Sequence, residues 1–166
     1  IMGRLGFNRV FLRDCSKNIE DTPQYFSAAL SLNATLASLS YAIAIFIAYL
    51  RYDSSVFFLI VVLGISLTLM TLDEASTKVF QSHQKMYFRA IVNLVTSVLY
   101  AALFFVGIYY FTVSVYTLAF LHLLMNLLRF SFGLLYSMKL SRPRFELATV
   151  KKLLKAGRPF CVIDII

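Results

Sequence analysis

Two uncharged stretches in the first half of the chain have the length of a membrane-spanning helix. Crossing about 30 Å of hydrocarbon takes roughly twenty helical residues, because each residue adds about 1.5 Å of rise. Phe26–Leu50 and Ser54–Leu72 contain no charged residue, and the helical pattern of the second continues toward Phe80. We therefore predict one spanning helix from each stretch.

A longer uncharged stretch, Ala90–Leu128, predicts two more spanning helices. It contains no Lys, Arg, Asp or Glu and is too long for a single crossing. We place these helices at about residues 90–111 and 115–138, with a tight turn near 111–114. The uncharged runs do not alternate between apolar and polar residues as barrel strands do. The predicted fold class is therefore all-α, a polytopic transmembrane helical bundle.

The composition indicates a membrane protein. Hydrophobic residues make up 60% and charged residues 14% of the chain, whereas soluble domains are about 45–50% apolar and about 25% charged. The mean hydropathy is +0.77, yet the formal net charge is +8. Strongly basic chains can bind nucleic acid, but here long uncharged runs separate the cations, so we expect no nucleic-acid partner.

The Lys and Arg residues fall into three segments that flank the predicted helices. Residues 1–25, 73–89 and 139–158 hold all but two of the 16 cations, the exceptions being Arg51 and Arg129. Basic segments beside membrane helices resist translocation. We therefore expect these three segments on the cytoplasmic side of a multi-pass protein of the cell membrane, with membrane lipids as partners.

The last basic segment has the pattern of an amphipathic helix. Between Ser141 and Gly157, apolar residues form one stripe and lysines another. We expect a helix that either lies on the inner membrane surface or is a solvated linker, and that ends at Gly157, before Pro159. The predicted domains are a transmembrane bundle at 1–138, a basic cytoplasmic linker at 139–158 and the start of the next spanning helix at 159–166.

Small and polar residues recur at steps of three and four along the fourth predicted helix and therefore share one face. They are Ala119, His122, Asn126, Arg129, Gly133 and Tyr136. An unpaired Arg inside a bilayer costs from about 3 to more than 10 kcal/mol. Arg129 therefore either lines a water-filled lumen that receives an anionic group, or snorkels to the inner headgroups. His122 and Asn126 are candidate substrate-binding residues beside it, with hydrogen bonding between helices as the alternative.

Each of the other three helices carries a milder polar face. These faces are Ser31, Thr35, Ser38 and Ala42 in the first helix, Gly64, Thr68, Thr71 and Ala75 in the second, and Asn93, Thr96, Ser97, Tyr100 and Gly107 in the third. Membrane helices use such residues for close packing. The same pattern also fits a bundle around a central cleft.

Asp73 and Glu74 are the carboxylates nearest the inner half of a predicted span. Glu74 precedes Lys78 by four residues, which favours a structural ion pair. The alternative for Asp73 and Glu74 is a site that couples transport to a proton or a cation.

Motifs for bond-making chemistry are absent from the sequence. It has no HExxH, no GxSxG, no phosphate-binding glycine loop and no Cys/His metal quartet. The two cysteines, Cys15 and Cys161, lie far apart and outside any metal-binding spacing. We therefore expect no enzymatic activity, no cofactor and no metal site.

Three segments carry a family resemblance. They are GRLGFNRVFLRD at Gly3–Asp14, VFQSHQKMYFRAIVNLVTSVLY at Val79–Tyr100 and VKKLLKAGRPF at Val150–Phe160. In that order they resemble the end of helix two, the junction of helices four and five, and the linker before helix seven of the polysaccharide-biosynthesis flippases. These exporters of lipid-linked oligosaccharides share a superfamily with the multidrug-and-toxin extruders. One departure is Arg4, where members often carry an acidic residue.

The resemblance implies a transporter of which this chain forms most of the N-terminal lobe, with the C-terminal lobe of the same chain missing. Two bundles would rock about a lumen whose basic residues receive the pyrophosphate of a polyprenyl-linked glycan, flipped from the cytoplasmic to the outer leaflet. Arg129 is the candidate lumen cation. The alternatives are a drug or metabolite exporter with acidic lumen residues, a membrane enzyme acting on lipid-linked sugars, and a noncatalytic assembly subunit.

Overall fold

Four long helices form the body of the molecule, and each corresponds to one predicted span. The computed structural model describes residues 7–110 and 114–163, and within them the chain is helical without strands. The elements are α1 (Phe7–Lys17), the 3-10 turn η1 (Ile19–Asp21), α2 (Thr22–Arg51), α3 (Ser54–Ser82), α4 (Met86–Tyr110), α5 (Val115–Leu140) and α6 (Leu147–Ile163). The all-α prediction is confirmed.

The helix boundaries follow local chemistry. Pro23 sits in the first turn of α2, where a proline costs no hydrogen bond. Between α3 and α4, Gln84 adopts a left-handed conformation (φ 55°), and the Lys85 N–H donates to Phe80 O at 2.9 Å, which reverses the chain. The turn predicted near 111–114 falls largely on 111–113, outside the described residues. Ser114 caps α5 by accepting from the Tyr116 N–H.

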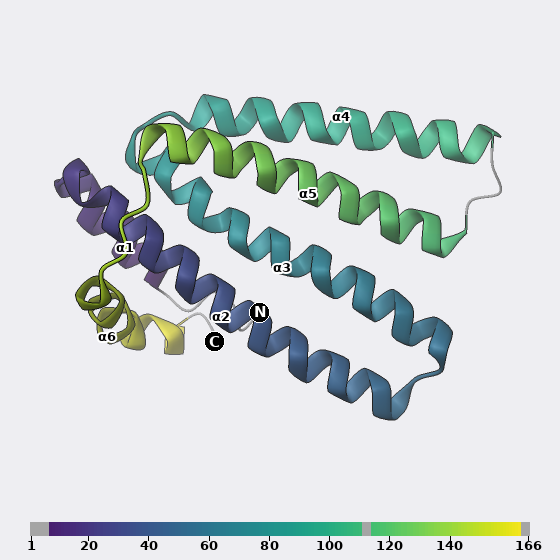
Figure 1. Ribbon diagram of the computed structural model, residues 1–166. Coiled ribbons are helices and arrows are strands. Elements are labelled where there is room, and N and C mark those ends of the chain that lie inside the picture. The colour runs from purple at the N-terminus through teal and green to yellow at the C-terminus, as the bar shows by residue number, and fades with distance from the viewer. Residues whose placement is uncertain (1–6, 111–113, 164–166) are drawn as a thin grey trace.

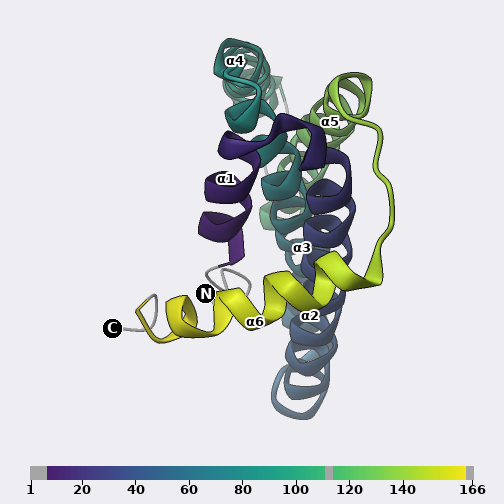
Figure 2. The same ribbon diagram turned by 90° about the vertical axis from the view of Figure 1, so that its left-hand side faces the viewer.

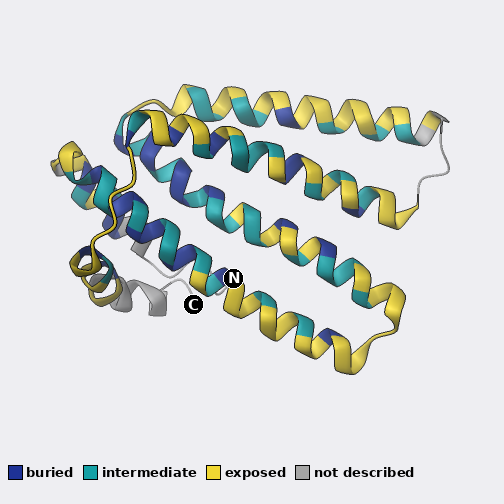
Figure 3. Ribbon diagram, in the orientation of Figure 1, coloured by how far each residue is buried: buried dark blue, intermediate teal, exposed yellow. Residues whose placement is uncertain are grey.

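The long helices lie side by side in the order α2, α3, α5, α4 (Figure 1). α3 packs between α2 and α5, and α4 packs chiefly on α5. They therefore form a row, not a closed ring around a central cleft. In the most apolar window of each helix only 6% to 22% of the residues are buried inside the protein, and exposed positions cover much of the row (Figure 3). Lipid is the solvent that such apolar surfaces require.

The basic segments meet at one end of the row. The starts of α2 and α4, the ends of α3 and α5, and both α1 and α6 lie there (Figure 1). The main hydrophobic core is also at this end, where Phe11 of α1, Phe26 of α2, Val79 of α3 and Leu153 of α6 are buried together. This core fixes the arrangement of four elements far apart in sequence.

The bounds predicted for the amphipathic helix are wrong at both ends. The strap, residues 141–146, is not helical, and α6 begins at Leu147 and runs through Gly157 and Pro159 to Ile163. A glycine inside a helix costs only about 1 kcal/mol, and a proline removes one hydrogen bond, so neither residue obliges a helix to stop.

Candidate functional site

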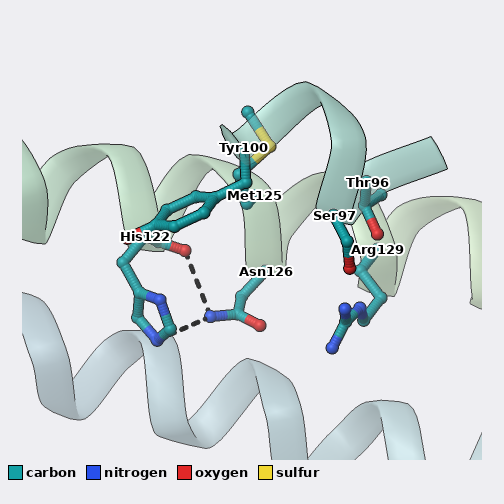
Figure 4. Close-up of a pocket in the computed structure, with 7 residues that line it drawn as sticks. All are labelled: Thr96, Ser97, Tyr100, His122, Met125, Asn126 and Arg129. Carbon is teal, nitrogen blue, oxygen red and sulfur yellow. Dashed lines mark hydrogen bonds between the residues drawn. The ribbon is translucent and has the colours of Figure 1, made fainter. Parts of the chain in front are cut away.

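A polar cavity of about 370 Å³ lies between α4 and α5. Its lining residues are Thr96, Ser97 and Tyr100 from α4, and His122, Met125, Asn126 and Arg129 from α5. Figure 4 shows the His122, Asn126 and Arg129 side chains side by side along α5, with the α4 residues Thr96, Ser97 and Tyr100 above them. The polar stripes predicted for the third and fourth spans thus meet in one hollow.

Arg129 brings an uncompensated positive charge to this cavity. Its guanidinium has no hydrogen-bond or ion-pair partner among the described residues. At 1.5 Å per residue, Arg129 lies about 16 Å from the Leu140 end of α5 and about 21 Å from the Val115 end, close to the middle of the helix. The rest of the lining contains no carboxylate and no second Lys or Arg, so an anion is the natural complement of the site.

Asn126 ties the cavity wall to α3. Its Nδ2 donates to Ser66 Oγ at 2.8 Å, and lies 3.0 Å from His122 Nε2 and 3.1 Å from His122 O. The His122 ring also packs edge-on against Tyr100, with ring centroids 6.3 Å apart. These contacts hold the His122 and Asn126 side chains at the cavity and join three helices around it.

A buried ion pair lies nearer the basic end of the same three helices. Arg89 of α4 donates through Nη1 to Asp73 Oδ1 of α3 at 2.8 Å, and through Nη2 to Asp73 Oδ2. The Asp73 side chain is 3% exposed and that of Arg89 is 11% exposed. Gly133 of α5 leaves the space for this pair, because a Cβ there would lie 2.6 Å from Asp73 Oδ1 and 3.3 Å from Arg89 Nη1. The pair fixes where α4 begins relative to α3 and α5.

Other predicted polar residues lie away from the cavity. Asp73 and Glu74 are not among its lining residues. The predicted stripe of α3 faces α2 instead: Asn33 Nδ2 donates to Thr71 O at 3.0 Å, and Tyr41 contacts the open side of Gly64. The α2 residues in these contacts, Asn33 and Tyr41, do not belong to the stripe predicted for α2, in which Thr35, Ser38 and Ala42 are exposed. No described residue of α2 lines the hollow.

Arg89 and Ser66 were not singled out from the sequence. Arg89 was counted as a cation of the segment 73–89, although it lies seven residues before Thr96 and therefore on the same helical face. The shared helical face with Thr96 is the sequence feature that could have singled out Arg89. Ser66 has no comparable signal, because its partner Asn126 lies 60 positions away.

Clusters of three or more His, Cys, Asp or Glu side chains that could hold a metal ion do not occur among the described residues. Fold and site together define a multi-pass membrane protein with a polar cavity that carries a single strong cation.

Comparison with family profiles identifies the family of the chain. The profile of the polysaccharide biosynthesis protein family matches residues 1–166, and the chain belongs to that family. No curated protein and no solved structure matches it significantly.

Proposed function

We propose that the protein is a flippase that moves a lipid-linked oligosaccharide or polysaccharide repeat unit from the cytoplasmic to the outer leaflet by alternating access. The observation that carries the proposal is the unpartnered Arg129 guanidinium in a polar cavity between two spanning helices of a polysaccharide biosynthesis protein. In a hydrocarbon layer about 30 Å thick centred on α5, Arg129 lies near the midplane, where an exposed charge is costly. A substrate phosphate would compensate that charge.

The cavity offers suitable chemistry for the polar part of such a substrate. A guanidinium binds phosphate oxygens through paired N–H donors. Ser97, Tyr100 and His122 supply hydrogen-bonding groups to the same space. The polyprenyl tail would stay in the lipid along the exposed apolar side of α4, where Leu94, Val98 and Phe105 lie at the surface.

A second lobe of the same chain would supply the opposite wall. Because the long helices form a row, the cavity between α4 and α5 is not enclosed by a ring of helices. Alternating access requires two bundles that rock around a shared site. We propose a C-terminal lobe of the same chain as that partner, with the basic end of the row on the cytoplasmic side.

The alternatives fit the site less well. A cation exporter needs negative charge in its lumen, and the lining contains no carboxylate. A membrane enzyme acting on lipid-linked sugars needs several acid and base groups converging on the substrate, and the lining contains one histidine. We therefore propose a transport role without bond-making chemistry.

Translocation of a lipid-linked glycan in vesicles containing the full-length protein tests the proposal. Arg129→Ala should lower the rate at least tenfold, because losing a charged hydrogen bond to substrate is worth about 1.5–3 kcal/mol. Lys139→Ala, which removes an exposed cation from the same helix, should leave the rate unchanged. Equal rates for Arg129→Ala and the wild type would refute the role of Arg129. Transport of cationic drugs in place of the glycan would favour the exporter.

A further inference from the structure

The strap that follows α5 is fixed across the start of α2 (Figure 2). Arg144 donates its backbone N–H to Pro23 O at 3.0 Å, and Ser27 Oγ donates to Arg144 O. These contacts hold the strap at the start of α2. The strap also begins directly after Leu140, the last residue of α5, so it lies at the ends of two membrane-spanning helices.

α6 uses one side to dock on the protein. Leu153 is fully buried in the core, and Thr149 is also buried. Lys152 turns toward the protein as well, since its Nζ donates to Tyr25 Oη at 2.6 Å and lies 3.4 Å from Asp14 Oδ2. At 100° per residue, the side of α6 opposite Leu153 is the side that faces away from the protein.

The outward side of the strap and α6 combines cations with exposed apolar side chains. The exposed cations are Arg142, Arg144, Lys151 and Lys155, and the exposed apolar residues are Phe145, Leu147 and Leu154. None of the four cationic side chains has a hydrogen-bond or ion-pair partner within the described part of the chain. Phe145 is 66% exposed although it is aromatic. Glu146, the acidic residue of this stretch, accepts from Thr149 Oγ1 at 3.0 Å.

We propose that this outward side, called here the linker surface, binds the anionic phospholipid headgroups of the leaflet at the basic end. The cations complement negative headgroups, and the exposed apolar side chains of Phe145, Leu147 and Leu154 insert between the acyl chains. Lysines and arginines at this depth extend their charged ends toward water while their aliphatic stems contact lipid. The linker surface then anchors α6 on both sides, to the protein through Leu153 and to the membrane through Lys151 and Lys155.

Phe145→Trp provides a direct probe, because the chain contains no tryptophan. The variant protein is reconstituted into nanodiscs of phosphatidylcholine mixed with increasing phosphatidylglycerol, both with brominated acyl chains that quench tryptophan in contact with lipid. We expect quenching that rises with the fraction of phosphatidylglycerol. Lys151→Gln or Lys155→Gln should each raise the fraction needed for half-maximal quenching about fivefold. The double variant should lose the dependence on lipid composition.

A matched control removes two cations from the same end but outside the linker surface. Lys85→Gln combined with Lys139→Gln should leave the quenching curve of Phe145→Trp unchanged, because both residues are exposed elsewhere at that end. Equal quenching at all compositions would overturn the proposal. Two further results would also overturn it. A blue-shifted but unquenched emission would mean that protein covers the side chain at position 145. An emission typical of tryptophan in water would mean that this side chain does not contact lipid.

Discussion

Gly133 leaves the space that the Asp73–Arg89 ion pair occupies near the basic end of the row. The Asp73–Arg89 pair occupies the space where a Cβ at Gly133 would lie. A buried ion pair contributes little net stability, but leaving one partner unpaired costs about 3–5 kcal/mol. The role of the pair is therefore to fix geometry, and the glycine is what admits it.

Gly133→Ala should destabilise the protein even though alanine favours helices by about 1 kcal/mol over glycine. The added Cβ meets Asp73 Oδ1 at 2.6 Å, and overpacking of this kind costs about 1–3 kcal/mol. Thermal unfolding of the purified protein in detergent measures the change. In the background Asp73→Ala/Arg89→Ala, which removes both crowding atoms, the same substitution should become neutral or stabilising. Destabilisation of equal size in both backgrounds would show that the ion pair is not the cause.

The sequence predicts residues on one helix better than partners across helices. His122, Asn126 and Arg129 could be grouped in advance, because steps of three and four place them on one face of a single helix. The pairing of Asp73 with Arg89 could not, because it depends on how α3 and α4 cross. The placement of His122, Asn126 and Arg129 at one cavity agrees with a role in substrate binding, which stays a prediction until transport is measured.

At the scale of elements, α6 is held by its contact with α1 and α2. Leu153 is fully buried beside Cys15, and burial raises the pKa of the Cys15 thiol to about 11. A thiol that is both inaccessible and protonated reacts slowly with alkylating reagents. Cys15 therefore reports on the docking of α6.

Leu153→Ala should accelerate alkylation of Cys15 at least tenfold in a Cys161→Ser background. Truncating a buried leucine costs about 2–5 kcal/mol, which here is lost from the α6 contact. Mass spectrometry after a maleimide pulse gives the rate. Leu154→Ala, a neighbouring change at a side chain that is 43% exposed, should leave the rate near that of the parent. If both variants reacted equally fast, α6 would not protect Cys15.

Asp14 makes the same contact sensitive to acid. Burial opposes ionisation, but hydrogen bonds from Tyr25 Oη at 2.8 Å and Arg13 Nε at 2.9 Å outweigh it and hold the pKa of Asp14 below its usual 3.8. A carboxyl with a lowered folded-state pKa stabilises the protein above the unfolded value and loses that contribution as the pH falls through the folded value. The wild type should therefore unfold at a higher temperature than Asp14→Asn at neutral pH, with the difference vanishing in acid. As a control, Glu20→Gln in the exposed η1 should unfold at the same temperature as the wild type at every pH. If the unfolding temperatures of the wild type and Asp14→Asn differed by the same amount at every pH, ionisation of Asp14 would not be the cause of that difference.

Long elements follow from the sequence, and their arrangement does not. Uncharged runs of sufficient length predicted α2 through α5, because backbone groups in lipid must pair within a helix. The order of the row is set by side-chain fit, such as Tyr41 against Gly64, which hydropathy does not report. The predicted end of the amphipathic helix at Gly157 is wrong for a different reason. Glycine and proline raise the free-energy cost of a helix without forbidding it.

At the scale of the whole molecule, the row is polarised along its length. The α3–α4 turn lies at the basic end, and the α2–α3 turn, which contains Asp53, lies at the opposite end (Figure 1). A helix with the 29 residues of α3 is about 43 Å long, which exceeds a hydrocarbon core of about 30 Å. Residues just beyond its two ends therefore lie in water on opposite sides of a membrane.

Labelling with a membrane-impermeant maleimide tests which side is which, in a background without Cys15 and Cys161. Asp53→Cys should react in intact cells, whereas Lys85→Cys should react only after the membrane is permeabilised, because basic segments stay in the cytoplasm. Both positions are exposed in the structure, so a difference in labelling reports the side of the membrane and not burial. The reverse pattern would place the basic end outside. The linker surface would then face the outer leaflet, and the proposed direction of transport would have to be reversed with it.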